Sequence, residues 1–267
     1  MSTPMLLRVA VIGPAGFGGH IYIDNNTDSQ LAEAMRDVDV VVSEYGPHTA
    51  GHQALQYVPF IEAVRKIILA VKKAKVGYFV MVGGAGSLHI AHEDDLCVAD
   101  SKDFFLAYRR AIADSHAHVS YMEDRLGPMG GGLRASDQET KAAKATIDEY
   151  EDGVKQDRAS DFIKAARASY MFFDGNTSFN WTFVSPSPLY RPGKRTGSYE
   201  VTIHNLPLKG EPKGENRLDG RLTGISAADL AIAIADEVES QKHKYQHWTA
   251  TADLSDDTPA PSYLRLE

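Results

Sequence analysis

The sequence predicts an α/β domain built on a doubly wound parallel sheet, shortened near its second strand and enlarged by a helical insertion. Apolar runs at 6–12, 38–43 and 78–82 alternate with segments whose apolar residues recur at helical spacing. A glycine-rich turn follows the first of these runs directly. The chain of 267 residues, with 43% hydrophobic and 24% charged residues, has the composition of a packed globular protein.

The three apolar runs predict buried strands. The first has the sequence LLRVAVI at 6–12 and ends at a glycine, and continuous apolar runs of this length suit a strand covered on both faces. Helical spacing is found between the strands, at 31–38 and at about 52–75. Such alternation indicates right-handed crossovers within one sheet. Segments 6–12, 38–43 and 78–82 are therefore expected to be neighbouring parallel strands.

Capping residues mark the start of two expected helices. Thr27 or Asp28 can cap the first, because a side-chain oxygen there accepts a hydrogen bond from the first helical turn. Ser226, with Asp229 three residues later, forms a capping-box-like start to an amphipathic helix that runs to Glu237.

The second half of the chain departs from the alternation of strands and helices. About 101–167 is rich in Ala, Asp, Lys and Arg, and is expected to form two or three helices with a glycine-rich break. A strand is expected at 180–184, followed by a rigid proline loop and a hairpin-like region at 197–203. We expect one domain over 1–251, including this helical insertion, and a loose C-terminal tail over 252–267.

Composition and charge exclude several classes of protein. The apolar stretches fall short of the roughly 20 residues that a membrane-spanning helix needs, and the formal charge of −8 disfavours nucleic acid as a partner. The start of the chain lacks the features of a secretory signal. The single cysteine, Cys97, agrees with a reducing compartment. We expect a cytoplasmic protein whose partner is a small-molecule substrate, with no membrane and no nucleic acid.

The turn after the first strand, GPAGFGG, has glycine at its first, fourth and seventh positions, Gly13, Gly16 and Gly19. Glycine permits a tight turn, and it lets a pyrophosphate approach the backbone N–H groups at the start of a following helix. A tight turn without any ligand is the alternative interpretation. Because the turn directly follows a buried strand, dinucleotide binding is favoured.

This turn resembles the GATGFIG loop of the atypical short-chain dehydrogenase/reductase family, which has a Rossmann-like fold. Six further segments are similar to that family, and the last four of them resemble its NAD(P)H-binding, NADH-flavin reductase-like branch. The resemblance covers roughly two thirds of the chain. Each motif alone has modest specificity for the family, but together they are specific. The six segments are IDNNTD at 23–28, VDVVVS at 38–43, YFVMVGGAGSL at 78–88, WTFVSP at 181–186, PGKRTG at 192–197 and ISAADLA at 225–231.

The resemblance implies an NAD(P)-binding domain and an oxidoreductase that reduces a small carbonyl, quinone, flavin or related conjugated compound. The coenzyme would be NAD or NADP, and a homodimer is the oligomeric state that the family suggests. The residues that the resemblance assigns to coenzyme binding are Gly13, Gly16, Phe17, Gly18, Gly19, Asp24, Gly83 and Ser185.

Two departures from the family pattern bear on coenzyme and substrate. Between Gly19 and Ile23 there is room only for a turn, where the family has a full helix and a second strand. That strand ends with the residue that chooses between NAD and NADP, so the choice and the retention of coenzyme binding both stay open. The insertion at 101–167 replaces a short loop beside the substrate cleft, and it could form a lid, a substrate pocket or a subunit contact.

Three residues are the catalytic candidates. Ser87 follows the strand at 78–82, at the edge where open α/β sheets bind ligands, although it could equally cap a loop. His89 has a side chain suited to proton transfer near neutral pH; an ordinary surface histidine is the alternative. Tyr190 lies on the proline loop and could close over a substrate.

The helical tyrosine and lysine, four residues apart, that usually serve short-chain dehydrogenases are missing. Tyr190 and Lys194 have this spacing, but Pro192 between them excludes a helix. No metal site is expected, because the histidine pairs of the sequence lack a third ligand at a spacing typical of zinc.

Three functions stay open on these observations. The leading interpretation is an NAD(P)-dependent oxidoreductase. A redox-neutral isomerase, cyclase or lyase that has lost the coenzyme role is favoured by the missing helix and strand. A non-catalytic dinucleotide sensor would suit the long charged insertion.

Overall fold

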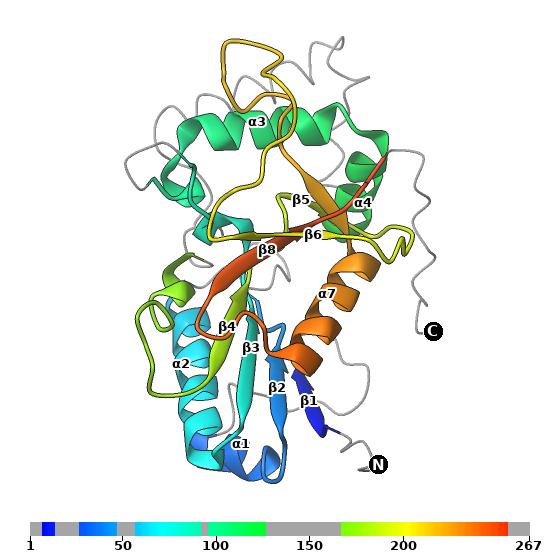
Figure 1. Ribbon diagram of the computed structural model, residues 1–267. Coiled ribbons are helices and arrows are strands. Elements are labelled where there is room, and N and C mark those ends of the chain that lie inside the picture. The colour runs from blue at the N-terminus through cyan, green and yellow to red at the C-terminus, as the bar shows by residue number, and fades with distance from the viewer. Residues whose placement is uncertain (1–6, 14–26, 47–56, 92–95, 127–166, 256–267) are drawn as a thin grey trace. The chain divides into compact units, whose positions relative to one another are not determined.

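The computed structural model describes residues 7–13, 27–46, 57–91, 96–126 and 167–255 (Figure 1). The chain divides into two compact units. The first comprises residues 1–87, 161–185 and 234–248, and the second comprises residues 88–160, 186–233 and 249–267. Helix α7 (Ala227–Ser240) and strand β8 (His247–Thr251) each begin in one unit and end in the other.

The first unit is built on a parallel sheet. Its strands are β1 (Val9–Ile12), β2 (Val40–Ser43), β3 (Tyr78–Val82) and β4 (Trp181–Val184), followed by the start of β8, in that spatial order (Figure 1). Every neighbouring pair is parallel. The prediction that the three apolar runs form neighbouring parallel strands is therefore confirmed.

Helices α1 (Asp28–Ala34) and α2 (Tyr57–Ala74) connect the first three strands. Of the two caps considered for α1, Thr27 is the one used. Its hydroxyl accepts a hydrogen bond from the Gln30 backbone at 3.3 Å, and the Gln30 side chain accepts one from the Thr27 backbone at 2.8 Å. The predicted cap of α7 is also confirmed, since the Ser226 hydroxyl accepts a bond of 3.0 Å from the backbone three residues on.

Side chains alternate between two faces of the sheet in the first unit, and helices cover both faces. Phe79 and Phe183 belong to one apolar core with buried residues of α1 and α2. Tyr78 lies on the opposite face, where its hydroxyl donates to Glu237 of α7. The doubly wound, Rossmann-like α/β fold that the sequence predicts is thereby confirmed.

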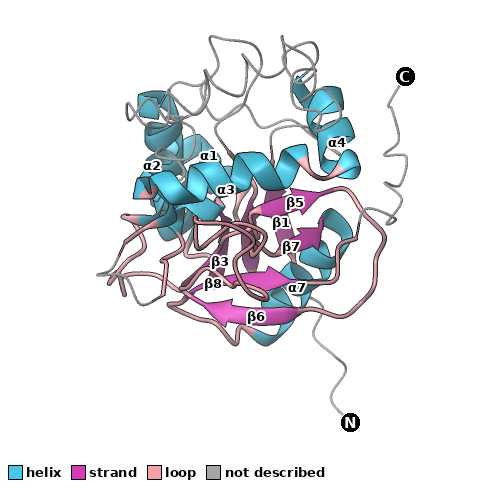
Figure 2. Ribbon diagram, turned by 90° about the horizontal axis from the view of Figure 1, so that it is seen from above, coloured by secondary structure: helices cyan, strands magenta, loops and turns pink. Residues whose placement is uncertain are grey.

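The second unit contains the start of the predicted insertion. Helices α3 (Lys102–Ala113) and α4 (His116–Leu126) confirm that the insertion begins with helices, whereas 127–166 lie outside the described residues. Strand β5 (Leu189–Arg191) pairs in parallel with β7 (Gly224–Ser226), as Figure 2 shows.

Strand β6 (Glu200–Ile203) has β8 as its neighbour in the strand order. The hairpin expected at 197–203 is therefore wrong, because β6 pairs with a strand far along the chain and not with an adjacent one. Two single-turn 3-10 helices, η1 (Ala85–Ser87) and η2 (Val98–Asp100), complete the elements. None of the described helices is long and apolar enough to cross a membrane.

Candidate functional site

Four small residues lie where the parallel strands of the first unit end. Gly13 follows β1, Ser43 ends β2, Gly83 follows β3 and Ser185 follows β4. The register aligns the last residues of β1 with those of β2, and the last residues of β3 with those of β4. The four residues therefore lie along one edge of the sheet, which we call the carboxyl edge. Open α/β sheets bind their ligands at this edge.

Ser43 is the unexpected member of the carboxyl edge. Its side chain is completely buried, and its Oγ has no hydrogen-bond partner among the described residues. Buried polar atoms are nearly always paired, because an unsatisfied hydroxyl costs about 1–3 kcal/mol. The sequence signal was a polar residue at the end of an otherwise apolar strand, and it was overlooked. Among the described residues, Ser43 is therefore a polar group at this edge that is free to accept or donate a hydrogen bond.

The two described glycines of the carboxyl edge are there for different reasons. A Cβ added to Gly83 would lie 2.2 Å from the ring of Phe183, so packing of that ring excludes any side chain. A Cβ added to Gly13 would meet no atom of the described residues within 4 Å. Gly83 is thus explained by the protein interior alone, whereas no described residue packs against Gly13. The other residues assigned to the coenzyme, namely Gly16, Phe17, Gly18, Gly19 and Asp24, lie outside the described residues.

Ser185 is held by the chain itself. Its hydroxyl lies 2.9 Å from the carbonyl oxygen of Gly84 and 2.8 Å from Nε2 of His247, and both side chains are buried. His247 packs against two aromatic rings, with ring centroids 4.6 Å from Tyr170 and 5.3 Å from Phe183. The sequence analysis named Ser185 but missed His247. Nothing local in the chain links two residues this far apart.

Ser87 is buried in η1, and its backbone N–H donates to the Gly84 carbonyl at 3.1 Å. Ser87 therefore belongs to the carboxyl edge, where the sequence placed it.

His89 and Tyr190 belong to the second unit, whereas Ser87 belongs to the first. His89 is half-buried; its Nε2 lies 3.3 Å from Sγ of Cys97, and its ring centroid lies 4.0 Å from that of His204. Tyr190 is half-buried in β5. No group of three potential metal ligands occurs among the residues that the structure describes.

Asp229 holds the PGKRTG loop of the second unit in place. Its carboxylate accepts backbone hydrogen bonds from Thr196 at 2.8 Å and Gly197 at 2.9 Å, and it also bonds the Thr196 and Ser226 hydroxyls. Desolvation acts to raise the pKa of the Asp229 carboxyl, but these hydrogen bonds outweigh it and lower the pKa. The motif residues of this segment therefore fix a loop.

The described part of the carboxyl edge suits a nicotinamide dinucleotide. Such a coenzyme presents ribose hydroxyls and phosphate oxygens, and the orphaned Ser43 Oγ can pair with groups of that kind. Among the described residues, none packs against Gly13, so none of them blocks a phosphate from the end of β1. Both features fit the group that the resemblance implies.

Comparison with known proteins shows what the chain resembles. No protein-family profile matches the chain. A protein of Bacillus subtilis (strain 168), the uncharacterized YwnB, is 26% identical over 223 residues, which cover 83% of this chain and 74% of YwnB.

Two solved structures illustrate the fold. A candidate epimerase from Bacteroides thetaiotaomicron is 21% identical, with a TM-score of 0.55 over 92% of this chain and 97% of its own. A candidate NADH-flavin reductase from Streptococcus pneumoniae TIGR4 is 18% identical, with a TM-score of 0.52 over 92% of this chain and 87% of its own. At these identities the likeness shows a shared Rossmann-like fold, which is the fold of the family that the sequence resembles.

Proposed function

We propose that the chain is an NAD(P)-dependent oxidoreductase of the atypical short-chain dehydrogenase/reductase type. Its substrate would be a small carbonyl, quinone, flavin or related conjugated compound. The observation that carries the proposal is the orphaned hydroxyl of Ser43 at the carboxyl edge, on a sheet of the Rossmann-like kind. The likeness to a structure described as a candidate NADH-flavin reductase supports the reaction class.

Some residues of this protein would bind the coenzyme, and others would transfer a proton to the substrate. The turn that starts at Gly13 would hold the pyrophosphate through backbone N–H groups, and Ser43 would bond a sugar or phosphate oxygen. When bound, the nicotinamide supplies the hydride. Ser87, His89 and Tyr190 remain the candidates for orienting the substrate or delivering a proton.

Calorimetric titration of Ser43→Ala with NADH and with NADPH tests the proposal. The hydroxyl has no partner among the described residues, so its removal is expected to leave the free energy of unfolding of the free protein unchanged or to raise it by up to about 1–3 kcal/mol. Coenzyme affinity is expected to fall by about tenfold, the equivalent of one lost hydrogen bond. Ser240→Ala, on the exposed end of α7, is the control and should change neither quantity.

A large loss of stability with unchanged affinity would contradict the proposal, since Ser43 would then serve the fold only. The same titration separates the alternatives. Tight binding with turnover supports the reductase, and tight binding without chemistry supports a dinucleotide sensor.

A redox-neutral enzyme is the second candidate, and one observation favours it. Strand β1 stands at the end of the strand order, with β2 as its only neighbour among the described residues. The second strand that carries the coenzyme selector in the family has no counterpart in that order. Wild-type protein that binds neither NADH nor NADPH would favour this candidate over the reductase.

A further inference from the structure

We propose that His247 is a positioning residue that fixes the turn carrying Ser87, acting through Ser185 and the Gly84 carbonyl. The inference rests on the proposed function where it concerns coenzyme and substrate. The hydrogen-bond chain itself stands on the structure of the first unit, to which all four residues belong.

Counting the available protons shows which atom donates in each of these hydrogen bonds. The Ser185 hydroxyl has one hydrogen and two partners, the Gly84 carbonyl at 2.9 Å and His247 Nε2 at 2.8 Å. A carbonyl oxygen can only accept, so Ser185 donates to Gly84. Both contacts are satisfied only when Nε2 carries a proton and donates to the Ser185 hydroxyl. The structure thus assigns His247 the Nε2–H tautomer.

His247 lies in an apolar environment, so packing alone does not explain why this position holds a histidine. His247 is only 2% exposed, and its ring packs against those of Tyr170 and Phe183. Burying an imidazole is unfavourable unless its nitrogens are bonded. Its bond to Ser185 connects the start of β8 with the end of β4.

The Gly84 carbonyl links these hydrogen bonds to the turn that carries Ser87. It accepts from Ser185 Oγ and from the backbone N–H of Ser87 at 3.1 Å. Two donors fix the orientation of the Gly84–Ala85 peptide plane, and in a trans peptide the Ala85 N–H then points away from Ser185. His247 therefore sets both the Ser87 backbone and the direction of an amide donor at the carboxyl edge.

Three variants test the proposal. His247→Leu and Ser185→Ala each break the chain, and each is expected to weaken NADH binding by about five- to tenfold. The double variant should bind no more weakly than Ser185→Ala alone, because both changes remove one shared interaction. His247→Gln retains an N–H donor and should keep the affinity within about twofold of the wild type.

Two measurements on the free protein decide the inference even without coenzyme binding. Nitrogen-15 spectra of the histidine side chains should show His247 protonated at Nε2, and hydrogen exchange of the Ser87 amide should speed up in His247→Leu but not in His247→Gln. A proton on Nδ1 alone, or equal exchange in all variants, would overturn it, as would additive losses of affinity. If wild-type protein binds no NADH, the proposed function fails while these two measurements still test the hydrogen-bond chain.

Discussion

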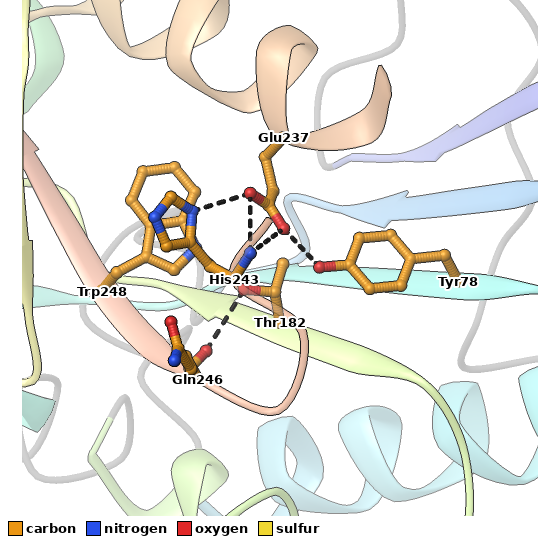
Figure 3. A network of polar contacts seen from close by, with 6 residues as sticks. All are labelled: Tyr78, Thr182, Glu237, His243, Gln246 and Trp248. Atoms are coloured by element: carbon orange, nitrogen blue, oxygen red, sulfur yellow. Dashed lines mark hydrogen bonds and ion pairs between the residues drawn. The ribbon is translucent and has the colours of Figure 1, made fainter. Parts of the chain in front are cut away.

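The two ends of the sheet in the first unit treat buried polar groups differently. At the amino end, Tyr78, Glu237 and His243 are hydrogen-bonded to one another (Figure 3). At the carboxyl edge, Ser43 has no partner among the described residues, and Ser185 relies on His247 and a backbone carbonyl. Polar groups closed on themselves serve stability, whereas polar groups left open are available to a ligand.

The amino-end network centres on a carboxylate that is 2% exposed, that of Glu237. This carboxylate accepts a hydrogen bond from the Tyr78 hydroxyl and another from the backbone N–H of His243, the latter at 3.0 Å. It also lies 2.7 Å from His243 Nδ1. Beside it, Trp248 Nε1 donates to the Thr182 hydroxyl at 2.8 Å (Figure 3). The network joins α7 to the sheet and to the turn before β8.

Removal of the central carboxylate should have the largest effect on stability. Glu237→Ala leaves the Tyr78 hydroxyl and the His243 imidazole without their partner, so we expect the free energy of unfolding to fall by about 3–5 kcal/mol in urea denaturation. Glu239→Ala, two residues along on the exposed side of α7, is the matched control and should change it by less than about 0.5 kcal/mol. A loss for Glu237→Ala as small as that of the control would mean that the amino end is not a stability element.

Glycine substitutions at the carboxyl edge sharpen the comparison. Gly83→Ala places a Cβ 2.2 Å from the Phe183 ring, and overpacking of this kind should lower the free energy of unfolding by about 1–3 kcal/mol. Gly13→Ala meets no atom of the part of the chain that the structure describes within 4 Å, and we expect it to leave stability unchanged. Combining Gly83→Ala with Phe183→Leu should recover part of the loss. Equal effects of the two glycine substitutions in thermal unfolding would contradict this assignment.

The smallest effect concerns alkaline pH. Burial first, and then the hydrogen bond with Glu237, raise the pKa of the Tyr78 hydroxyl above its ordinary value of about 10. A raised pKa in the folded state means that the stabilising contribution is complete below about pH 10 and is lost as the pH rises beyond that value. Tyr78→Phe has no such group and should be about 1 kcal/mol less stable than the wild type at neutral pH.

The difference between the wild type and Tyr78→Phe should therefore shrink as the pH rises from about 9 to about 11 in urea denaturation. Other tyrosines and lysines titrate in this range in both proteins, and the comparison cancels their contribution. A difference that stays constant with pH would show that the Tyr78 phenol is not held neutral by its surroundings.

Local sequence signals were enough to predict the framework. Continuous apolar runs predicted the parallel strands, because a strand covered on both faces must be apolar throughout. Thr27 and Ser226 predicted helix starts, because a cap bonds a backbone group only two or three residues away. The same short range explains why Gly13 and Ser87, which follow β1 and β3 along the chain, could be expected after the ends of these strands.

The contents of that edge were decided by the tertiary structure. His247 and Ser185 are 62 residues apart, and Tyr78 and Glu237 are 159 apart, so no spacing rule connects either pair. Ser43 was missed because a missing partner is a property of the packed interior and not of the residue type. The sequence by itself determined which segments become strands and helices, since those depend on neighbours along the chain. Which polar groups are satisfied and which are left for a ligand was decided only when distant segments packed together, because hydrogen bonds and burial depend on distance in space.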